Sequence, residues 1–290
     1  MTLDRLLAQA SARLAAAGSP SPRLDAEVLL CHVLGVDRTW LYTWGDRQAP
    51  VFEWAQFEAL VAARAQGHPI AYLTGEREFW GLRLVTSPHT LIPRPDTERL
   101  VEAALAHALR PAGRLLDLGT GTGAIALAFA SERPGWSVLG VDIRPEAVCL
   151  ARHNAERLAI TNALFRESDW FAALMDENDG EGFDLIVSNP PYIAAKDPHL
   201  ARGDVRFEPH SALVADDEGL ADLRHVAREA CRYLAPGGFL LLEHGFEQAK
   251  QVRDVLVAEG YDQVASLRDL GGHPRVSMGQ RVEEGAGGPR

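Results

Sequence analysis

Apolar side chains at helical spacing dominate the first part of the chain. Leucines at positions 3, 6, 7 and 14 fall on one face of a helix, and Gly18-Ser19-Pro20 predicts its end. Ser21 is expected to cap a second helix, because Pro22 suits a first helical turn. A third helix is predicted from about Val51 to Ala65, and no alternating strand pattern is seen. We therefore expect a helix bundle at residues 1–75.

Between residues 76 and 95 the pattern changes from helical to extended. Apolar residues over Phe79–Val85 predict a strand or a hairpin. Two prolines flank Arg94, and proline disfavours helix in the residue before it, so an extended linker is expected there. Asp96 or Thr97 is then expected to cap the next helix. We expect a hairpin and linker at residues 76–95.

Over residues 96–282 short apolar strands alternate with amphipathic helices. This alternation predicts an α/β domain with a doubly wound, mostly parallel sheet. Two strand-like stretches near its end, joined by Gly271-Gly272, predict a hairpin that adds an antiparallel edge strand. The last residues, 283–290, are acidic and then glycine-rich, and a disordered tail is expected. The central strands are expected at 115–118, 138–142, 163–165, 184–188 and 239–243.

A glycine-rich turn follows the first predicted strand of this sheet. Glycine tolerates positive φ and lets a ligand approach the backbone, and doubly wound sheets bind nucleosides at the carboxyl ends of their strands. The next strand ends at Asp142, where a carboxylate suits the two hydroxyls of a ribose. A dinucleotide and S-adenosylmethionine both fit, and the simpler alternatives are a turn without a ligand and a helix cap at Asp142. The turn comprises Gly119, Thr120, Gly121, Thr122 and Gly123.

Asp169 and Trp170 follow the third predicted strand of the sheet. The Asp169 carboxylate can accept a hydrogen bond from an adenine amino group, and Trp170 offers a flat apolar wall. Packing of Trp170 in the core is the alternative interpretation. These two residues are therefore candidates for contact with the base of a nucleoside.

Four residues after the fourth predicted strand carry the candidate chemistry. An amide or exocyclic amino nitrogen is a poor nucleophile because its lone pair is delocalised. The Asn189 side-chain oxygen and the Pro190 carbonyl can accept its two N–H groups, which favours a pyramidal nitrogen with its lone pair aimed at a methyl carbon. Tyr192 can stack on the planar group, although two prolines also simply end a strand. This segment, Asn189-Pro190-Pro191-Tyr192, predicts methylation of a planar nitrogen.

The charge balance argues against a polyanion as the main partner. The chain has 29 Lys and Arg against 40 Asp and Glu, a formal net charge of −11, whereas nucleic-acid affinity rests largely on basic side chains. Widely spaced cysteines and the lack of a membrane-length apolar run predict a cytoplasmic protein, with a monomer as the default. No metal site is predicted, and no role follows for Glu243 or for the candidate bases His153, His199, His210 and His244.

Together these motifs resemble the release factor glutamine N5-methyltransferases, the PrmC/HemK family. The resemblance extends over nearly the whole chain and includes further segments at 70–75, 78–81, 91–98, 206–209 and 268–276. It implies a class I S-adenosylmethionine-dependent methyltransferase fold, preceded by a helical domain that helps dock the substrate. The slight departures from the family pattern, His89 and the tail, do not touch the inferred site.

The resemblance also implies a substrate and a division of roles. The substrate is the glutamine of the Gly-Gly-Gln loop in class 1 peptide chain release factors, with S-adenosylhomocysteine as the other product. Residues 119–123, Asp142, Trp170 and Asn189 would bind S-adenosylmethionine, and residues 189–192 would hold the glutamine amide.

Two other enzyme classes share part of this pattern. Adenine-N6 methyltransferases of DNA and RNA share the Asn-Pro-Pro-Tyr motif, but the net charge and the helical N-terminal part argue against them. A nicotinamide-dependent oxidoreductase fits the glycine turn and leaves residues 189–192 unexplained. The segment Pro93–Glu98 favours the release factor enzymes, because related methyltransferases of a ribosomal-protein glutamine typically diverge there.

Overall fold

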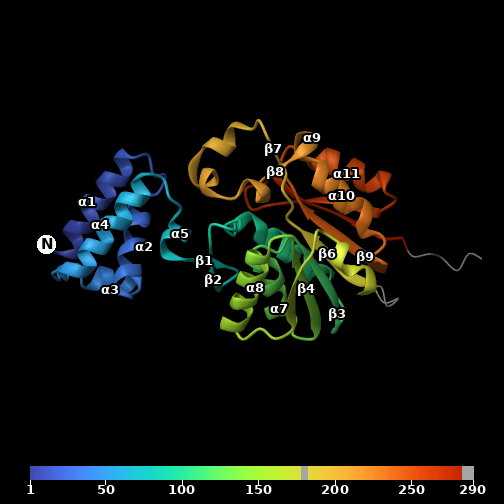
Figure 1. The fold of residues 1–290 in the computed structure, drawn as a ribbon, viewed down its shortest axis with the longest axis horizontal. Helices are drawn as coiled ribbons and strands as arrows, with labels where there is room; N and C mark the ends of the chain where they lie inside the picture. The colour runs from blue at the N-terminus through green and yellow to red at the C-terminus, as the bar shows by residue number, and fades with distance from the viewer. Residues whose placement is uncertain (178–181, 283–290) are drawn as a thin grey trace, which may run out of the picture. The chain divides into compact units, whose positions relative to one another are not determined.

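The computed structural model describes residues 1–177 and 182–282 of the chain, so the predicted tail at 283–290 lies outside the described residues (Figure 1). The chain forms two compact units. The first comprises Met1–Glu76 together with Ala201–Phe207, and the second comprises Arg77–Leu200 and the chain from Glu208 onward. The helical unit thus includes a short segment from much later in the sequence.

The helical unit has a core of interlocking leucines and one large aromatic ring. Leu6, Leu14, Leu29 and Phe57 are all fully buried in it. The expected capping by Ser21 is not seen, because its hydroxyl donates to the Asp25 carboxylate at 2.9 Å instead of meeting a backbone N–H. The helices are α1 (Leu3–Ala16), α2 (Pro22–Leu34), α3 (Arg38–Thr43), α4 (Val51–Ala65) and α5 (Ile70–Thr74).

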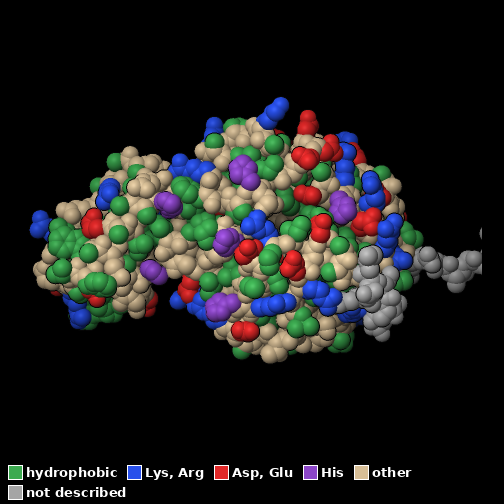
Figure 2. Space-filling model, viewed as in Figure 1, with side chains coloured by type: hydrophobic (Ala, Val, Ile, Leu, Met, Phe, Trp, Pro, Cys, Tyr) green, Lys and Arg blue, Asp and Glu red, His purple; other side chains and the backbone are tan. Residues whose placement is uncertain are grey.

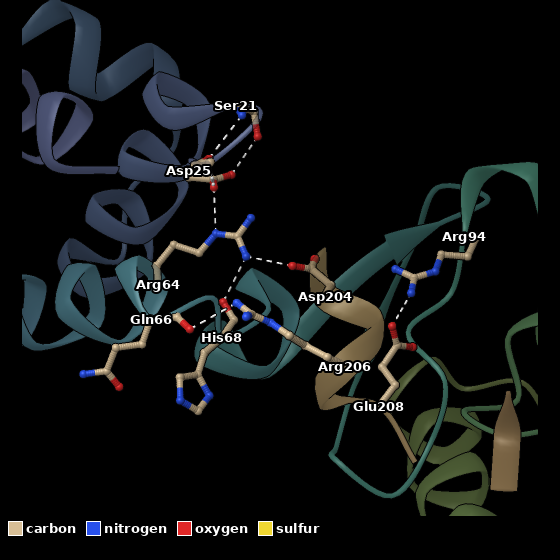
Figure 3. Close-up of polar contacts among 10 residues, drawn as sticks. Ser21, Asp25, Arg64, Gln66, His68, Arg94, Asp204, Arg206 and Glu208 are labelled. Carbon is tan, nitrogen blue, oxygen red and sulfur yellow. Dashed lines mark hydrogen bonds and ion pairs between the residues drawn. The ribbon is translucent and has the colours of Figure 1, made fainter. Parts of the chain in front are cut away.

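Residues 201–207 are tied to this helical unit by polar contacts (Figure 3). The Arg64 guanidinium lies 2.7 Å from the Asp25 carboxylate and 2.8 Å from that of Asp204. Arg206 donates to the carbonyl of Gln66 at 3.2 Å. The Arg64 side chain is largely buried, so its two carboxylate partners offset the cost of burying its charge.

The second unit is built on a seven-stranded sheet with the order β10-β11-β9-β6-β3-β4-β5. Strands β3, β4, β5, β6 and β9 pair in parallel, β11 is antiparallel to β9, and β10 is antiparallel to β11. The predicted doubly wound, mostly parallel sheet with its terminal hairpin is confirmed. The strands are β3 (Gly113–Leu118), β4 (Trp136–Asp142), β5 (Ala163–Glu167), β6 (Phe183–Ser188), β9 (Leu234–Glu243), β10 (Asp262–Arg268) and β11 (Pro274–Gln280).

Helices cover both faces of this sheet (Figure 1). Alternate residues of a strand point to opposite faces, so Leu115 packs with the cluster that contains α6, α7 and α8, whereas Leu116 packs with the cluster that contains α10 and α11. Both leucines are fully buried. The helices are α6 (Glu98–His107), α7 (Ala124–Glu132), α8 (Pro145–Arg157), α10 (Ala221–Ala230) and α11 (Ala249–Ala258).

A hairpin and a linker precede the sheet, as the extended pattern predicts. Trp80 and Gly81 both have positive φ and form the turn between the two strands. The short 3-10 turn η1 (Pro95–Thr97) then leads into α6. Thr97 already has helical φ and ψ and does not cap α6 with its side chain, because a capping residue needs an extended backbone. The hairpin strands are β1 (Glu76–Phe79) and β2 (Leu82–Val85).

A long irregular connection runs from β6 to α10. Its elements are β7 (Ile193–Ala194), η3 (Pro198–Ala201), η4 (Gly203–Phe207), η5 (His210–Ala212), β8 (Val214–Ala215) and α9 (Asp216–Gly219). A further short helix, η2 (Ala172–Glu177), lies between β5 and β6. Across residues 1–177 and 182–282, no helix is both long enough and apolar enough to cross a membrane.

Candidate active site

The ends of four neighbouring strands bring four residues into one row. Leu118 of β3 pairs in register with Ser188 of β6, and Ser188 pairs with Leu242 of β9. The residues that follow these strands, or end them, are therefore neighbours at the carboxyl edge of the sheet. From β4 to β9 this row is Asp142, Gly119, Asn189 and Glu243.

The glycine-rich turn after β3 is held against the end of β4 by backbone hydrogen bonds. The N–H groups of Gly119 and Thr120 both donate to the carbonyl of Val141 at 2.9 Å. The Asp142 carboxylate accepts the N–H of Gly121 at 2.9 Å. Gly119, Gly121 and Gly123 all have positive φ, a conformation that glycine adopts without a steric cost. The turn therefore presents backbone rather than side chains to a ligand.

A buried acid lies beneath the turn. Asp117 is fully buried and accepts the Thr120 hydroxyl at 2.7 Å. Burial raises the pKa of Asp117 to about 7, against the smaller opposing effect of its hydrogen bonds to Thr120 and to the backbone of Ala126. The Asp117 carboxyl group holds the Thr120 hydroxyl in place. Because desolvation disfavours the charged carboxylate, ionisation of Asp117 near neutral pH lowers the stability of the folded state.

Trp170 lies beside the glycine turn in a strained backbone conformation. Its φ is 48°, which is unusual for a bulky residue. Two hydrogen bonds stabilise this segment: the Ser168 N–H donates to the Asp142 carbonyl at 3.0 Å, and the Ser168 hydroxyl donates to the Trp170 carbonyl at 2.8 Å. The strain is retained where the ring of Trp170 lines a pocket.

The glycine turn and Asn189 line the same pocket, which has a volume of about 310 Å³. Asp142, Asp169 and Trp170 also line it, whereas Gly123, Pro190 and Tyr192 do not. All of its lining residues belong to the second unit. The further lining residues that sequence reasoning did not assign include Thr90, Leu91, Arg94, Thr97, Ile143 and Asp222.

The segment after β6 is anchored by contacts with Thr97, Glu243 and Gln248. The Asn189 side-chain amide donates to the Thr97 hydroxyl at 3.4 Å. Tyr192, whose ring is predicted to stack on the target group, packs against the core cluster of α10 and α11, and its hydroxyl donates to Glu243 at 3.3 Å. Its carbonyl accepts the Gln248 amide at 3.0 Å. We therefore place Tyr192 as a support of the segment.

Glu243 ends β9 as a fully buried carboxyl group beside this segment. One of its oxygens, Oε2, has no hydrogen-bond partner among the described residues. Burial raises the pKa of Glu243 to about 7, while Thr97, Arg275 and Tyr192 oppose that rise. Burial likewise raises the pKa of the Tyr192 hydroxyl, which keeps it protonated and able to donate.

The proline-rich linker is fixed by a second buried acid, Glu208 (Figure 3). Its carboxylate accepts the N–H of Ile92 at 2.9 Å and forms an ion pair with Arg94. Glu208 is 4% exposed, so one charge is almost wholly removed from water and its partner Arg94 lines the pocket. Breaking such a pair leaves a buried charge without compensation. Glu208 thereby sets the position of one wall of the pocket.

Comparison with known proteins identifies the family. A family described as the PrmC N-terminal domain matches residues 5–75, and a methyltransferase domain family matches residues 109–268. The release factor glutamine methyltransferase of Vibrio cholerae is 55% identical over 98% of this chain and 98% of its own length. The enzyme of that name from Escherichia coli is 53% identical over 90% of this chain and 93% of its own length. The chain belongs to the release factor glutamine methyltransferase family.

The solved structures show the same fold at much lower identity. A methyltransferase from Pyrococcus furiosus is 20% identical, with a TM-score of 0.52 over 78% of this chain and 98% of its own. At this level of identity the similarity shows the methyltransferase fold alone. The fold and the family expected from the motifs are thus both confirmed.

The four candidate bases His153, His199, His210 and His244 do not line the pocket that carries Asn189, whereas His89, expected to lie away from the site, does line it. His244 is buried, and its ring nitrogens contact Ser277 at 2.8 Å and the Gly245 carbonyl at 2.9 Å. Burial lowers the pKa of His244, so it is neutral at physiological pH. His199 is exposed and lies 2.8 Å from Asp197. Among the residues that the structure describes, no group of three or more His, Cys, Asp or Glu could hold a metal ion.

Proposed function

We propose that this protein transfers a methyl group from S-adenosylmethionine to the side-chain nitrogen of the glutamine in the Gly-Gly-Gln loop of class 1 peptide chain release factors. The observation that carries this proposal is that Asn189 lines the same pocket as the glycine turn, at the ends of adjacent strands. The names of the relatives support the same reaction and substrate.

The pocket residues fit an adenosyl group. The turn at 119–123 offers backbone N–H groups and no bulky side chains, and Asp142 is held at the end of β4, where the hydroxyls of a ribose bind in doubly wound sheets. Asp169 and Trp170 line the pocket beyond it and suit an adenine ring. When bound, S-adenosylmethionine supplies an electrophilic methyl group. We assign residues 119–123, Asp142, Asp169 and Trp170 to its binding.

The segment at 189–192 provides the acceptors that a glutamine amide needs. Asn189 uses its amide nitrogen toward Thr97, so its side-chain oxygen is left for one N–H of the substrate. We propose that the carbonyl of Pro190 accepts the other. Two fixed acceptors favour a nitrogen whose lone pair points at the methyl carbon, and a methylated nitrogen that becomes acidic can lose its proton to water. This step requires no basic side chain.

A nucleic-acid substrate is disfavoured by the charge of the molecule. The net charge is −11, and acidic and basic side chains are interspersed on the face shown in Figure 2 rather than gathered into a basic patch. A nucleic-acid enzyme needs Lys and Arg along the path of the phosphates. We further propose that residues 1–75 help dock the release factor and that one copy of the chain suffices for the reaction.

Methyl transfer to a release factor tests this proposal directly. The purified protein is incubated with methyl-labelled S-adenosylmethionine and a class 1 release factor, in parallel with a release factor that carries Gln→Ala in its Gly-Gly-Gln loop and with bulk nucleic acid. Label is expected only in the unaltered release factor. Equal label in both release factors, or label in nucleic acid alone, would contradict the substrate assignment.

A further inference from the structure

A buried polar cluster adjoins Asn189, and one of its members, Thr97, also lines the pocket. Asn189 donates through Nδ2 to the hydroxyl of Thr97 at 3.4 Å, and Tyr192 donates to Oε1 of Glu243 at 3.3 Å. Thr97 and Glu243 are 4% and 1% exposed, and the Thr97 side chain interacts with the Glu243 carboxyl group. The proposed methyl transfer uses Asn189 but assigns no function to Thr97 or Glu243.

The unsatisfied oxygen of Glu243 determines which groups of the cluster donate hydrogen bonds and which accept them. Oε2 of Glu243 has no partner among the described residues, and a buried carboxylate oxygen without a donor is costly. The Thr97 hydroxyl, which lowers the pKa of Glu243 as a side-chain donor, is the neighbour that can supply that proton. A Thr97 hydroxyl that donates to Glu243 has only lone pairs left for Asn189. It must then meet the NH2 end of the Asn189 amide, because two acceptors do not bind each other.

We propose that Glu243 is a positioning residue that acts through Thr97 to hold the Asn189 amide with its nitrogen on the Thr97 hydroxyl and its oxygen toward the substrate nitrogen. An asparagine amide is nearly symmetric in shape, so packing alone distinguishes its two orientations poorly. An ionised carboxylate can only accept hydrogen bonds, and it therefore imposes one polarity on the chain from Glu243 through Thr97 to Asn189. This inference rests on the proposed role of Asn189 in methyl transfer.

Protonation of Glu243 removes this polarity. A protonated carboxyl group can donate to Thr97, whose hydroxyl is then free to donate to the oxygen of Asn189, and the amide turns its NH2 group toward the pocket. Burial raises the pKa of Glu243 to about 7, so the change falls near neutral pH. The groups that face Glu243 are Tyr192, Arg275 on β11 and Asp96 on η1. Arg275 and Arg94 in the linker also face the Tyr192 hydroxyl.

The local packing explains why a glutamate rather than a neutral residue holds this position. Tyr192 stays protonated over the range in which Glu243 titrates, because burial raises the pKa of Tyr192 well above its ordinary value. Tyr192 and Thr97 are then two donors that converge on one acceptor group. Arg275 supports the charged form of Glu243, and it is held in place by Asp96 at 3.3 Å and Asp269 at 3.4 Å.

Nuclear magnetic resonance of the full-length protein without substrate tests the orientation itself. The Asn189 side-chain NH2 signals, assigned by their absence in Asn189→Ala, are followed through a pH titration together with the Glu243 carboxyl carbon. We expect both to change with the same midpoint near neutral pH. The coupled change of the Asn189 signals should be lost in Thr97→Val and kept in Thr97→Ser. Asn189 signals that do not change as Glu243 titrates in the unaltered protein would overturn the proposal.

Kinetics with a release factor test the consequence for the reaction. Glu243→Gln and Thr97→Val should lower kcat by on the order of tenfold or more and abolish the rise of kcat with pH around neutrality. The KM for S-adenosylmethionine should change by no more than about twofold in Glu243→Gln, because Glu243 does not line the pocket. Thr97→Ser, which keeps the hydroxyl, should restore both kcat and its pH profile.

Thermal unfolding of each variant separates loss of position from loss of fold. The proposal would be contradicted if Glu243→Gln kept the melting temperature and the kcat of the unaltered protein and showed the same fall of kcat toward acidic pH. The titration needs no substrate, so an inactive protein with coupled Asn189 and Glu243 signals would count against the proposed function alone. An active protein whose variants keep their pH profile would count against the role of Glu243 alone.

Discussion

Leu118 and Ser188 are paired in register across β3 and β6, and the Ser188 hydroxyl donates to the Leu118 carbonyl at 2.8 Å. This bond locks the ends of two strands on which the whole site depends, because Gly119 follows one and Asn189 follows the other. The order of the strands reverses at this point of the sheet, since the chain leaves β3 for β4 on one side and returns to β6 on the other. Doubly wound sheets bind their ligands at such a point.

Replacement of Asn189 by alanine should greatly lower turnover while leaving most of the affinity for the cofactor. The substitution removes the side-chain oxygen that is proposed to accept the target N–H. An oriented acceptor contributes a few kcal/mol to transition-state stabilisation, so its loss lowers kcat by on the order of a hundredfold or more. Binding of S-adenosylhomocysteine, measured by calorimetry, should weaken much less. Near-normal turnover of Asn189→Ala would remove Asn189 from the mechanism.

Replacement of Asp142 by alanine should act mainly on the cofactor. The Asp142 carboxylate accepts the N–H groups of Gly121 at 2.9 Å and Arg144 at 3.0 Å, so its loss frees the turn as well as the proposed ribose contact. We expect the dissociation constant of S-adenosylmethionine to rise by roughly tenfold to a hundredfold, since hydrogen bonds to a charged group contribute about 1.5–3 kcal/mol each. Asp254→Ala, on the exposed face of α11, is the control and should leave binding unchanged.

Replacement of Gly219 by alanine should displace the segment at 189–192 from behind. A Cβ at Gly219 would lie 2.2 Å from the Tyr192 carbonyl oxygen and 2.9 Å from the Gln248 amide. Gly260 has the same φ of 86° with open space around it, so Gly260→Ala carries the backbone strain without the clash. We expect kcat to fall by about tenfold or more in Gly219→Ala and to stay unchanged in Gly260→Ala. Equal effects of the two changes would show that backbone strain, rather than the clash, is responsible.

The stability of the protein should respond to Glu243 in a pH-dependent way. The folded-state pKa of Glu243, about 7, is above its ordinary value of 4.5. Between these values the unfolded chain is ionised while the folded chain keeps its proton, so the contribution of Glu243 to stability is present below pH 4.5 and is lost as the pH rises to about 7. Glutamine carries no such penalty. The free energy of unfolding of Glu243→Gln, relative to that of the unaltered protein, should therefore increase with pH by on the order of 3 kcal/mol.

Denaturant titrations of both proteins at pH 5 and pH 8 measure this difference. The buried acid Asp117 is present in both proteins, so its own contribution cancels. A difference that stays constant with pH, or that shrinks as the pH rises, would mean that Glu243 titrates near its ordinary value in the folded protein.

The fold could be read from the sequence because its strands are short apolar runs: Gly119 follows β3, Asp142 ends β4, and Asn189-Pro190 follows β6. The predicted strands at 115–118, 138–142 and 184–188 all lie within the observed β3, β4 and β6. The pairing of these strands follows from the right-handed crossovers that helices impose on parallel sheets. The row formed by Asp142, Gly119 and Asn189 is therefore implied by topology, and the structure places all three in one pocket.

The supporting residues could not be found in this way. Thr97 was expected to be a possible helix cap, but its backbone is already in the 3-10 turn, so its hydroxyl is available to Asn189. Glu243 received no role because its contact with Tyr192 depends on β9 lying beside β6. Glu208 likewise contacts Arg94 only through the folded path of the connection after β6. Such contacts arise from tertiary structure and leave no local spacing in the sequence.

The central claim concerns one nitrogen atom, and tandem mass spectrometry of the release factor after a reaction with S-adenosylmethionine locates it. We expect the peptide with the Gly-Gly-Gln loop to be one methyl group heavier, with fragmentation placing the methyl group on the glutamine side chain, and we expect Asn189→Ala to leave this peptide largely unmodified. A methyl group on another residue, or an unmodified loop after complete conversion of the cofactor, would contradict this claim.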